Sequence, residues 1–193
     1  MRIEGLILAA GLSSRAPGFK MTLPLGNLTV IEHTIKSMMP ICQRIVVVGG
    51  FRYEALLPIC DRYEQVELVV NPEYERGMFS SVKCGMKALT CDRFFMTPGD
   101  YPLVRESVYR QLLEHDGDVI IPSYNRRSGH PILVKAVHIP ACIENTGFKT
   151  MRDFIKTMSL SYITVEDEGV LMDIDTAEDY EKIRRRYTDE NNR

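Results

Sequence analysis

The sequence lacks any apolar run that approaches the ~20 residues needed for a membrane-spanning helix. It also lacks an excess of charge of one sign, because 24 lysine and arginine residues face 26 aspartate and glutamate residues, for a net charge of −2. This balance argues against a protein that binds nucleic acid or a membrane surface. An anionic ligand must therefore be met by local cations rather than by the field of the whole chain.

Cysteine pairs with metal-binding or redox spacing are missing as well. The five cysteines are odd in number and include no C-x-x-C pair, so we expect reduced, mostly buried thiols and no structural zinc. The first four residues, Met1-Arg2-Ile3-Glu4, place an acid where a signal peptide needs an apolar stretch. These features predict a cytoplasmic protein.

No Pro/Ser-rich linker, internal repeat or low-complexity segment marks a boundary between domains. A chain of 193 residues suits one domain of the usual ~100–200 residues. We expect residues 1–193 to form that domain, with the polar residues 188–193 frayed.

Short apolar runs alternate with segments of helical periodicity along the chain. Strands are predicted at residues 3–8, 45–48, 68–70, 93–97, 119–121, 131–135 and 160–164, with Pro122 closing the fifth. Helices are predicted at residues 30–39, 54–60, 80–89, 104–114, 136–144, 149–158 and 177–187. Continuous apolar strands separated by helices predict βαβ units. The expected fold is α/β, a three-layer Rossmann-like, mainly parallel sheet with helices on both faces.

The first apolar strand leads into a turn of small residues that carries two cations. Residues 8–15 read L-A-A-G-L-S-S-R, and Lys20 follows five residues after Arg15. Small side chains let backbone N–H groups approach phosphate oxygens, and the two cations can neutralise their charge. The spacing is not that of a P-loop, and Gly11 has no partner glycine two residues on, as a dinucleotide fingerprint requires. The turn predicts a triphosphate site, and the alternative is an ordinary polar loop.

An aspartate follows the strand predicted at residues 93–97. Asp100 lies in the string T-P-G-D-Y-P, where Pro98 and Gly99 stop the strand and Pro102 delays the next helix. Ligands of open α/β sheets bind at the carboxyl ends of the strands, so Asp100 is a candidate metal ligand. The alternative is an N-cap for the following helix.

The second candidate acid comes from far along the chain. Asp175 or Thr176 is a good N-cap, and Glu178 would complete a capping box with Asp175. Asp173 lies two residues earlier and points to the same side if the segment is extended. We therefore expect Asp173 to be the second metal ligand and Asp175 to act as a cap or support. Two carboxylates with phosphate oxygens and waters suit Mg²⁺.

Two further loops carry candidate binding residues. In the loop at residues 71–81, Gly77 loosens the turn and Ser80 or Ser81 can cap the next helix, whose free N–H groups favour an anion. His130 follows Arg126 and Arg127, basic residues that could meet an acidic acceptor. The simpler interpretation of His130 is a hydrogen-bonded turn residue.

Taken together, these strings resemble the MobA-like nucleotidyltransferases, and among them the molybdenum cofactor cytidylyltransferases. The resemblance rests on L-A-A-G-L-S-S-R with Lys20 and the L-P pair at 23–24, N-P-x-Y…G-M-x-x-S from residue 71, G-D-x-P from 99, G-H-P from 129 and D-I-D-T-A-E-D from 173. Ala16-Pro17 stands where the family usually has Met-Gly, and Ala177 replaces a proline.

The resemblance implies a fold of the nucleotide-diphospho-sugar transferase type and a role for each matching residue. Catalysis is expected of Arg15, Lys20 and Asp100. Nucleotide contacts are expected from Leu8, Ala9, Ala10, Gly11, Ser13, Ser14, Arg15, Lys20, Ser81 and Gly99. Acceptor contacts are expected from Gly129, His130, Pro131 and Gly147, and Mg²⁺ is expected on Asp100 and Asp173.

The implied reaction moves a nucleoside monophosphate from a nucleoside triphosphate to a phosphorylated small molecule and releases pyrophosphate. CTP is favoured because the turn reads L-A-A-G where guanylyl-transferring relatives carry L-A-G-G, and the Ala10 methyl could crowd a purine. The implied acceptor is molybdopterin, with handover of the product to a molybdoenzyme as an extension. Alternatives are a sugar- or alcohol-phosphate nucleotidyltransferase and a non-catalytic nucleotide- or cofactor-binding assembly factor. A glycosyltransferase using the D-x-D string at 173–175 ranks below both.

Overall fold

The computed structural model describes residues 1–12 and 18–191. Ser13, Ser14 and Arg15, which the sequence assigns to the nucleotide site, lie outside the described residues. The strands are β1 (Ile3–Ala9), β2 (Pro24–Leu25), β3 (Leu28–Thr29), β4 (Arg44–Gly49), β5 (Val66–Val70), β6 (Arg93–Pro98), β7 (Val119–Tyr124), β8 (Arg127–Ser128), β9 (Ile132–Lys135) and β10 (Leu160–Thr164). The α-helices are α1 (Val30–Met38), α2 (Leu57–Cys60), α3 (Met78–Met86), α4 (Glu106–Leu113), α5 (Ile139–Glu144), α6 (Met151–Ile155) and α7 (Ala177–Asn191).

One large sheet has the strand order β10-β7-β9-β6-β1-β4-β5, with β8 paired to β7. Neighbouring strands run parallel except at β9, which is antiparallel to β6 and β7, and at β8, which is antiparallel to β7. β2 and β3 form a separate hairpin. The mainly parallel sheet is thus as predicted, and β8 and β9 are the strands that depart from the parallel arrangement.

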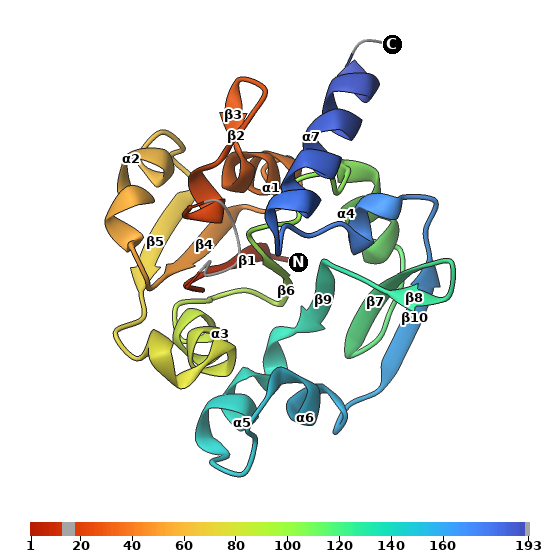
Figure 1. Ribbon diagram of the computed structural model, residues 1–193. Coiled ribbons are helices and arrows are strands. Elements are labelled where there is room, and N and C mark those ends of the chain that lie inside the picture. The colour runs from red at the N-terminus through yellow and green to blue at the C-terminus, as the bar shows by residue number, and fades with distance from the viewer. Residues whose placement is uncertain (13–17, 192–193) are drawn as a thin grey trace.

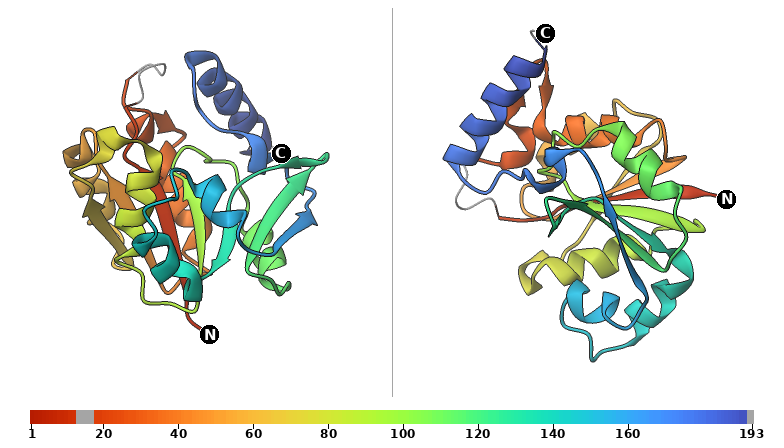
Figure 2. Two further views of the ribbon diagram at one scale, coloured as in Figure 1. Left: turned by 90° about the horizontal axis from the view of Figure 1, so that it is seen from below. Right: turned by 90° about the vertical axis from the view of Figure 1, so that its right-hand side faces the viewer.

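Helices cover both faces of the large sheet (Figures 1 and 2). Successive side chains of a strand point to opposite faces. Ile7 of β1 and Phe95 of β6 share a core with α1, α2 and α4. Leu6 of β1 and Phe94 of β6 share a second core with α3, α5 and α6. The predicted three-layer architecture is therefore confirmed.

A third, smaller core joins the two ends of the chain. The β2–β3 hairpin packs against α7, and the Tyr180 hydroxyl donates a hydrogen bond to the Pro24 carbonyl oxygen. Ile174, which is fully buried, belongs to the same core and leads into α7. Figure 2 shows the hairpin and α7 together at the end of the molecule opposite the N-terminus. This packing holds the segment before α7 beside the residues that precede the hairpin.

Several predicted boundaries were wrong. β7 does not stop at Pro122, because Ser123 and the next residue pair with β8 and the Pro122 carbonyl accepts the Gly129 N–H at 2.9 Å. α7 does not end at Tyr187 but extends to Asn191, and Glu190 in its last turn forms ion pairs with Arg186 at 3.0 Å and with Arg105 at 3.1 Å.

The cysteines are as expected, because all five are free and three of them are buried. Within the described residues, none of the helices has the length and apolar character required to traverse a lipid bilayer.

Candidate active site

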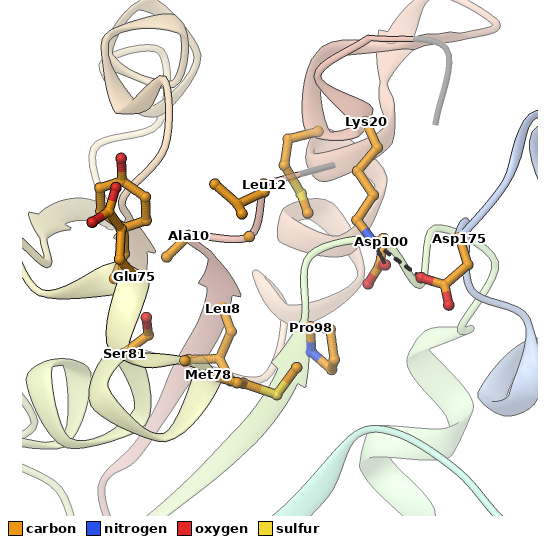
Figure 3. A pocket seen from close by; sticks show the side chains of 14 residues that line it. Leu8, Ala10, Leu12, Lys20, Glu75, Met78, Ser81, Pro98, Asp100 and Asp175 are labelled. Atoms are coloured by element: carbon orange, nitrogen blue, oxygen red, sulfur yellow. Dashed lines mark hydrogen bonds and ion pairs between the residues drawn. The ribbon is translucent and has the colours of Figure 1, made fainter. Parts of the chain in front are cut away.

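A pocket opens at the carboxyl edge of the sheet, where β1 and β6 end side by side. These strands are parallel neighbours with Leu8 opposite Pro98, and the Gly99 N–H donates to the Leu8 carbonyl at 2.9 Å. The turn after β1 and the aspartate after β6 therefore emerge together. The pocket has a volume of about 380 Å³ (Figure 3). Its lining residues are Leu8, Ala10, Gly11, Leu12, Lys20, Met21, Tyr74, Glu75, Gly77, Met78, Ser81, Pro98, Asp100 and Asp175.

At one end of the pocket, Lys20 joins three distant segments of the chain. Its ammonium forms an ion pair with Asp100, donates to the Ile174 carbonyl at 3.1 Å and lies 3.5 Å from Asp175 Oδ1. Figure 3 shows the three charged side chains converging. The structure thus brings together the cation from the N-terminal segment and acids from the middle and end of the chain.

Asp100, Asp173 and Asp175 form a cluster in which one carboxylate oxygen of each lies within 4.8 Å of the others. Asp100 is only 4% exposed, and its Oδ1 has no hydrogen-bond partner among the described residues. Burial raises the pKa of the Asp100 carboxyl, against the opposing effect of Lys20. Burial, and secondly Asp100, raise the pKa of Asp173. Closely spaced carboxylates with an unsatisfied buried oxygen fit a hard divalent cation, which prefers oxygen ligands.

The segment before α7 differs from the expected capping arrangement. Because α7 begins at Ala177, its N-cap is Thr176, and the capping box pairs Thr176 with Asp179 rather than Asp175 with Glu178. The Asp179 carboxylate accepts the Thr176 N–H at 2.9 Å, and the Thr176 hydroxyl accepts the Asp179 N–H at 3.2 Å. Asp175 is therefore not the cap, and its carboxylate lines the pocket instead.

The opposite end of the pocket is built by the segment between β5 and α3. Ser81 is buried and its hydroxyl accepts a hydrogen bond from Asn71 Nδ2 at 3.0 Å. Neither candidate serine caps α3, because the helix starts at Met78 after Gly77, whose φ is +97°. Ser80 lies in the first turn, where its hydroxyl donates back to the Gly77 carbonyl at 2.8 Å.

Some of the residues predicted to contact the nucleotide line the pocket, and others do not. Leu8, Ala10 and Gly11 line it together with Lys20 and Ser81. Ala9 and Gly99 are not among the lining residues. Ala9 is fully buried in the core on the α1 side. A Cβ atom at Gly99 would lie 2.8 Å from Met21 Sδ, so that glycine makes room for Met21.

Several lining residues were missed in the sequence. Leu12 is 55% exposed and Met78 is 66% exposed. Large apolar side chains inside otherwise polar loops are a signal that could have marked them as pocket walls. Tyr74, Glu75 and Met21 carried no comparable signal, because their place in the pocket depends on how distant loops fold together.

The acceptor candidates fall in two places. The His130 N–H donates to the Val170 carbonyl at 2.9 Å, and its ring packs edge-on against Tyr101, the neighbour of Asp100, with centroids 5.0 Å apart. Burial lowers the pKa of His130 to about 4, and its Nδ1 has no partner among the described residues.

Gly129 and Pro131 flank His130, and a Cβ atom at Gly129 would lie 2.2 Å from the Val170 carbonyl oxygen. Gly147 lies between α5 and α6, and its neighbours Thr146 and Phe148 line a different groove.

Comparisons with known proteins identify the family to which the chain is similar. The family model for the MobA-like NTP transferase domain matches residues 5–162. The molybdenum cofactor cytidylyltransferase of Escherichia coli is 32% identical over 97% of this chain and 98% of its own length. A probable molybdenum cofactor guanylyltransferase of Carboxydothermus hydrogenoformans is 24% identical over 94% of this chain and 95% of its own length.

Solved structures share the fold. A nucleotidyl transferase from Methanothermobacter thermautotroptrophicus superposes with a TM-score of 0.85 at 24% identity, covering 97% of this chain and 98% of its own. The molybdopterin-guanine dinucleotide biosynthesis protein A of Archaeoglobus fulgidus gives a TM-score of 0.70 at 17% identity, covering 96% of this chain and 99% of its own.

Proposed function

This chain belongs to the MobA-like NTP transferase domain family, and on that premise we propose that it transfers a nucleoside monophosphate from a nucleoside triphosphate to a phosphorylated acceptor, releasing pyrophosphate. The observation that carries the proposal is the meeting of Lys20, Asp100 and Asp175 at the end of β1 and β6. A small-residue turn, a cation and a cluster of acids at one strand edge suit a metal-bound triphosphate.

In this reaction the chain contributes position and charge rather than a covalent step. The turn from Leu8 to Arg15, with Lys20, binds the phosphates and offsets the negative charge that grows on the leaving pyrophosphate. An acceptor that is already an ionised phosphate monoester can attack the α-phosphorus without a general base. The ring of His130 contacts Tyr101, the neighbour of Asp100, and this contact supports an acceptor site at Gly129–Pro131.

Mg²⁺ is the proposed metal, held by Asp100 and Asp173 with Asp175 beside them. The cluster of three carboxylates and the unsatisfied Asp100 Oδ1 support this assignment. When bound, the ion would neutralise phosphate charge that a single ammonium leaves unbalanced. Lys20 then has two roles, to hold the Asp100 carboxylate in place and to contact phosphate.

CTP is the proposed nucleotide and molybdopterin the proposed acceptor. The turn L-A-A-G, the Ala10 side chain in the pocket wall and the name of the Escherichia coli relative all favour cytidylyl transfer. Handover of the product to a molybdoenzyme would follow from the same proposal, as would a cytoplasmic location.

The test is pyrophosphate release by the purified protein with Mg²⁺ and each nucleoside triphosphate in turn, with and without molybdopterin. We expect release that requires both CTP and molybdopterin. Release with sugar or alcohol phosphates instead would support the alternative transferase. Saturable CTP binding without release under any of these conditions would contradict the enzyme proposal and favour an assembly factor.

A further inference from the structure

A second hollow lies on the other side of the segment that carries Ser80 and Ser81. It is an open groove of about 550 Å³ between α3 and the connection from α5 to α6. Ser80 faces this groove and Ser81 faces the pocket described above, and the two hollows share no lining residue. The groove is lined by Asn71, Pro72, Glu73, Arg76, Phe79, Ser80, Lys83, Cys84, Lys87, Thr146, Phe148 and Lys149.

The groove carries a net positive charge, whereas the chain as a whole carries a net negative charge. Arg76, Lys83, Lys87 and Lys149 line it, and Glu73 is the acid among its lining residues. Glu73 is already matched, because its carboxylate forms an ion pair with Arg76 at 2.6 Å. Within the described parts of the chain, no carboxylate lies within salt-bridge distance of the ammonium groups of the three lysines that line the groove. Three positive charges are thus concentrated in one groove of a protein whose net charge is −2.

Lys83 is not an ordinary solvated lysine. Its ammonium donates to the Asn145 carbonyl at 3.2 Å and lies 5.1 Å above the centre of the Phe79 ring. Its side chain is half-buried, so its position in the groove is fixed by contacts from both walls. A held cation loses less side-chain entropy on binding an anion than a free one does.

The remaining walls are aromatic. Phe79 comes from α3 and Phe148 from the opposite wall, and both are half-buried. The Phe148 ring is braced edge-on against the buried Phe154, with centroids 5.5 Å apart. Aromatic faces bind flat rings by stacking, whereas ammonium groups bind phosphate oxygens by charge-assisted hydrogen bonds.

We propose that this groove is a second ligand site, which binds a small phosphate monoester of a planar aromatic group independently of the nucleotide pocket. The ring lies against Phe148, and the phosphate is held by Lys83, Lys87 and Lys149. The phosphate group of the ligand is inferred from the cluster of lysines, and its planar ring is inferred from the aromatic walls.

The groove carries its own reporter in Cys84. Cys84 is half-buried in the groove, whereas Cys91, the other half-buried cysteine, lies elsewhere. The probe is 4-methylumbelliferyl phosphate, and the measurement is the rate of iodoacetamide labelling of each cysteine by mass spectrometry, with and without saturating CTP. We expect saturable protection of Cys84 and no protection of Cys91, at the same probe concentration whether or not CTP is present.

Two matched sets of controls assign the ligand chemistry. Lys83→Gln and Lys87→Gln should each raise the probe concentration needed for half-protection about tenfold, whereas Lys36→Gln, which removes an exposed lysine of α1, should leave it unchanged. Umbelliferone without phosphate and inorganic phosphate without the ring should both protect weakly.

The proposal is overturned if Cys84 is not protected, if the groove variants protect as well as the wild type, or if either fragment alone protects as well as the probe. Competition by CTP would show instead that the probe occupies the nucleotide pocket. Because the readout needs no turnover, it can fail or succeed independently of the nucleotidyl-transfer assay.

Discussion

The acidic end of the pocket and the basic groove are opposite in sign and in construction. Lys20, Asp100 and Asp175 come from segments far apart in the sequence, and Asp100 is buried. The groove's cations are largely local, since Lys83 and Lys87 are one turn apart on or next to α3. Buried charges interact strongly and are screened little by salt, whereas exposed ones are screened within ~10 Å. Substitutions at the acidic end should therefore have large effects, and those at the groove smaller, salt-dependent ones.

The largest expected effect is that of Asp100→Asn. The amide keeps the size of the side chain but removes the buried charge that pairs with Lys20 and would bind the metal. Pyrophosphate release should fall about 10²–10³-fold, comparable to the loss of one key electrostatic group elsewhere. Asp116→Asn is the matched control, because Asp116 is 94% exposed and pairs only loosely with Lys135 at 3.6 Å. Equal turnover of Asp100→Asn and wild type would refute the metal assignment.

The next effect concerns folding rather than chemistry and compares Gly129, which precedes His130, with Gly147, which lies in the connection from α5 to α6 beside the groove. In Gly129→Ala the new Cβ would lie 2.2 Å from the Val170 backbone, which cannot move as a side chain can. In Gly147→Ala the nearest atom is Asn145 Oδ1, at 3.0 Å. We expect the first variant to lose about 3 kcal/mol of unfolding free energy and the second to stay within about 0.5 kcal/mol of wild type.

Urea denaturation measures both free energies. If Gly129→Ala is as stable as Gly147→Ala, the close approach to Val170 is not what requires a glycine there. A role in acceptor binding would then be the better explanation for Gly129.

The sequence was most informative where local pattern decides the outcome. Apolar runs and helical periods located the strands and the three layers, and the residues that stop each strand placed the L-A-A-G turn and Asp100 at strand ends. It was least informative where tertiary contacts decide. Pro122 was expected to end a strand, but pairing with β8 extends that strand beyond it.

The same limit applies to the segment before α7. Asp175 and Thr176 were both good caps by sequence; α7 begins at Ala177, as predicted, with Thr176 as its cap, and Asp175 faces Lys20. Tyr74 and Glu75 reach the pocket only because the segment after β5 folds over it. No periodicity or motif in that segment predicts that these two side chains reach the pocket.

A smaller effect should separate the two late acids. Asp173 is the proposed metal ligand, whereas Asp175 lies nearer Lys20 and the pocket wall. Asp173→Asn should weaken Mn²⁺ binding about tenfold, or ~1.4 kcal/mol, and Asp175→Asn should weaken it less. Electron paramagnetic resonance of free Mn²⁺ measures this without turnover. A larger loss in Asp175→Asn would reverse the two roles, and Asp179→Asn would show how much of either effect arises from a loosened α7 cap.

The smallest expected effect tests whether the two hollows share a support. Asn71 Nδ2 donates to Ser80 Oγ at 2.9 Å on the groove side and to Ser81 Oγ at 3.0 Å on the pocket side. In Asn71→Asp this donor is lost, and both hydroxyls must turn to donate to a buried carboxylate. We expect CTP and 4-methylumbelliferyl phosphate each to bind several-fold more weakly by calorimetry, while Asn27→Asp, the same charge change in the exposed β2–β3 turn, alters neither. If only one of the two affinities changes, Asn71 does not support both sites, and the pocket and the groove are held in place independently of each other.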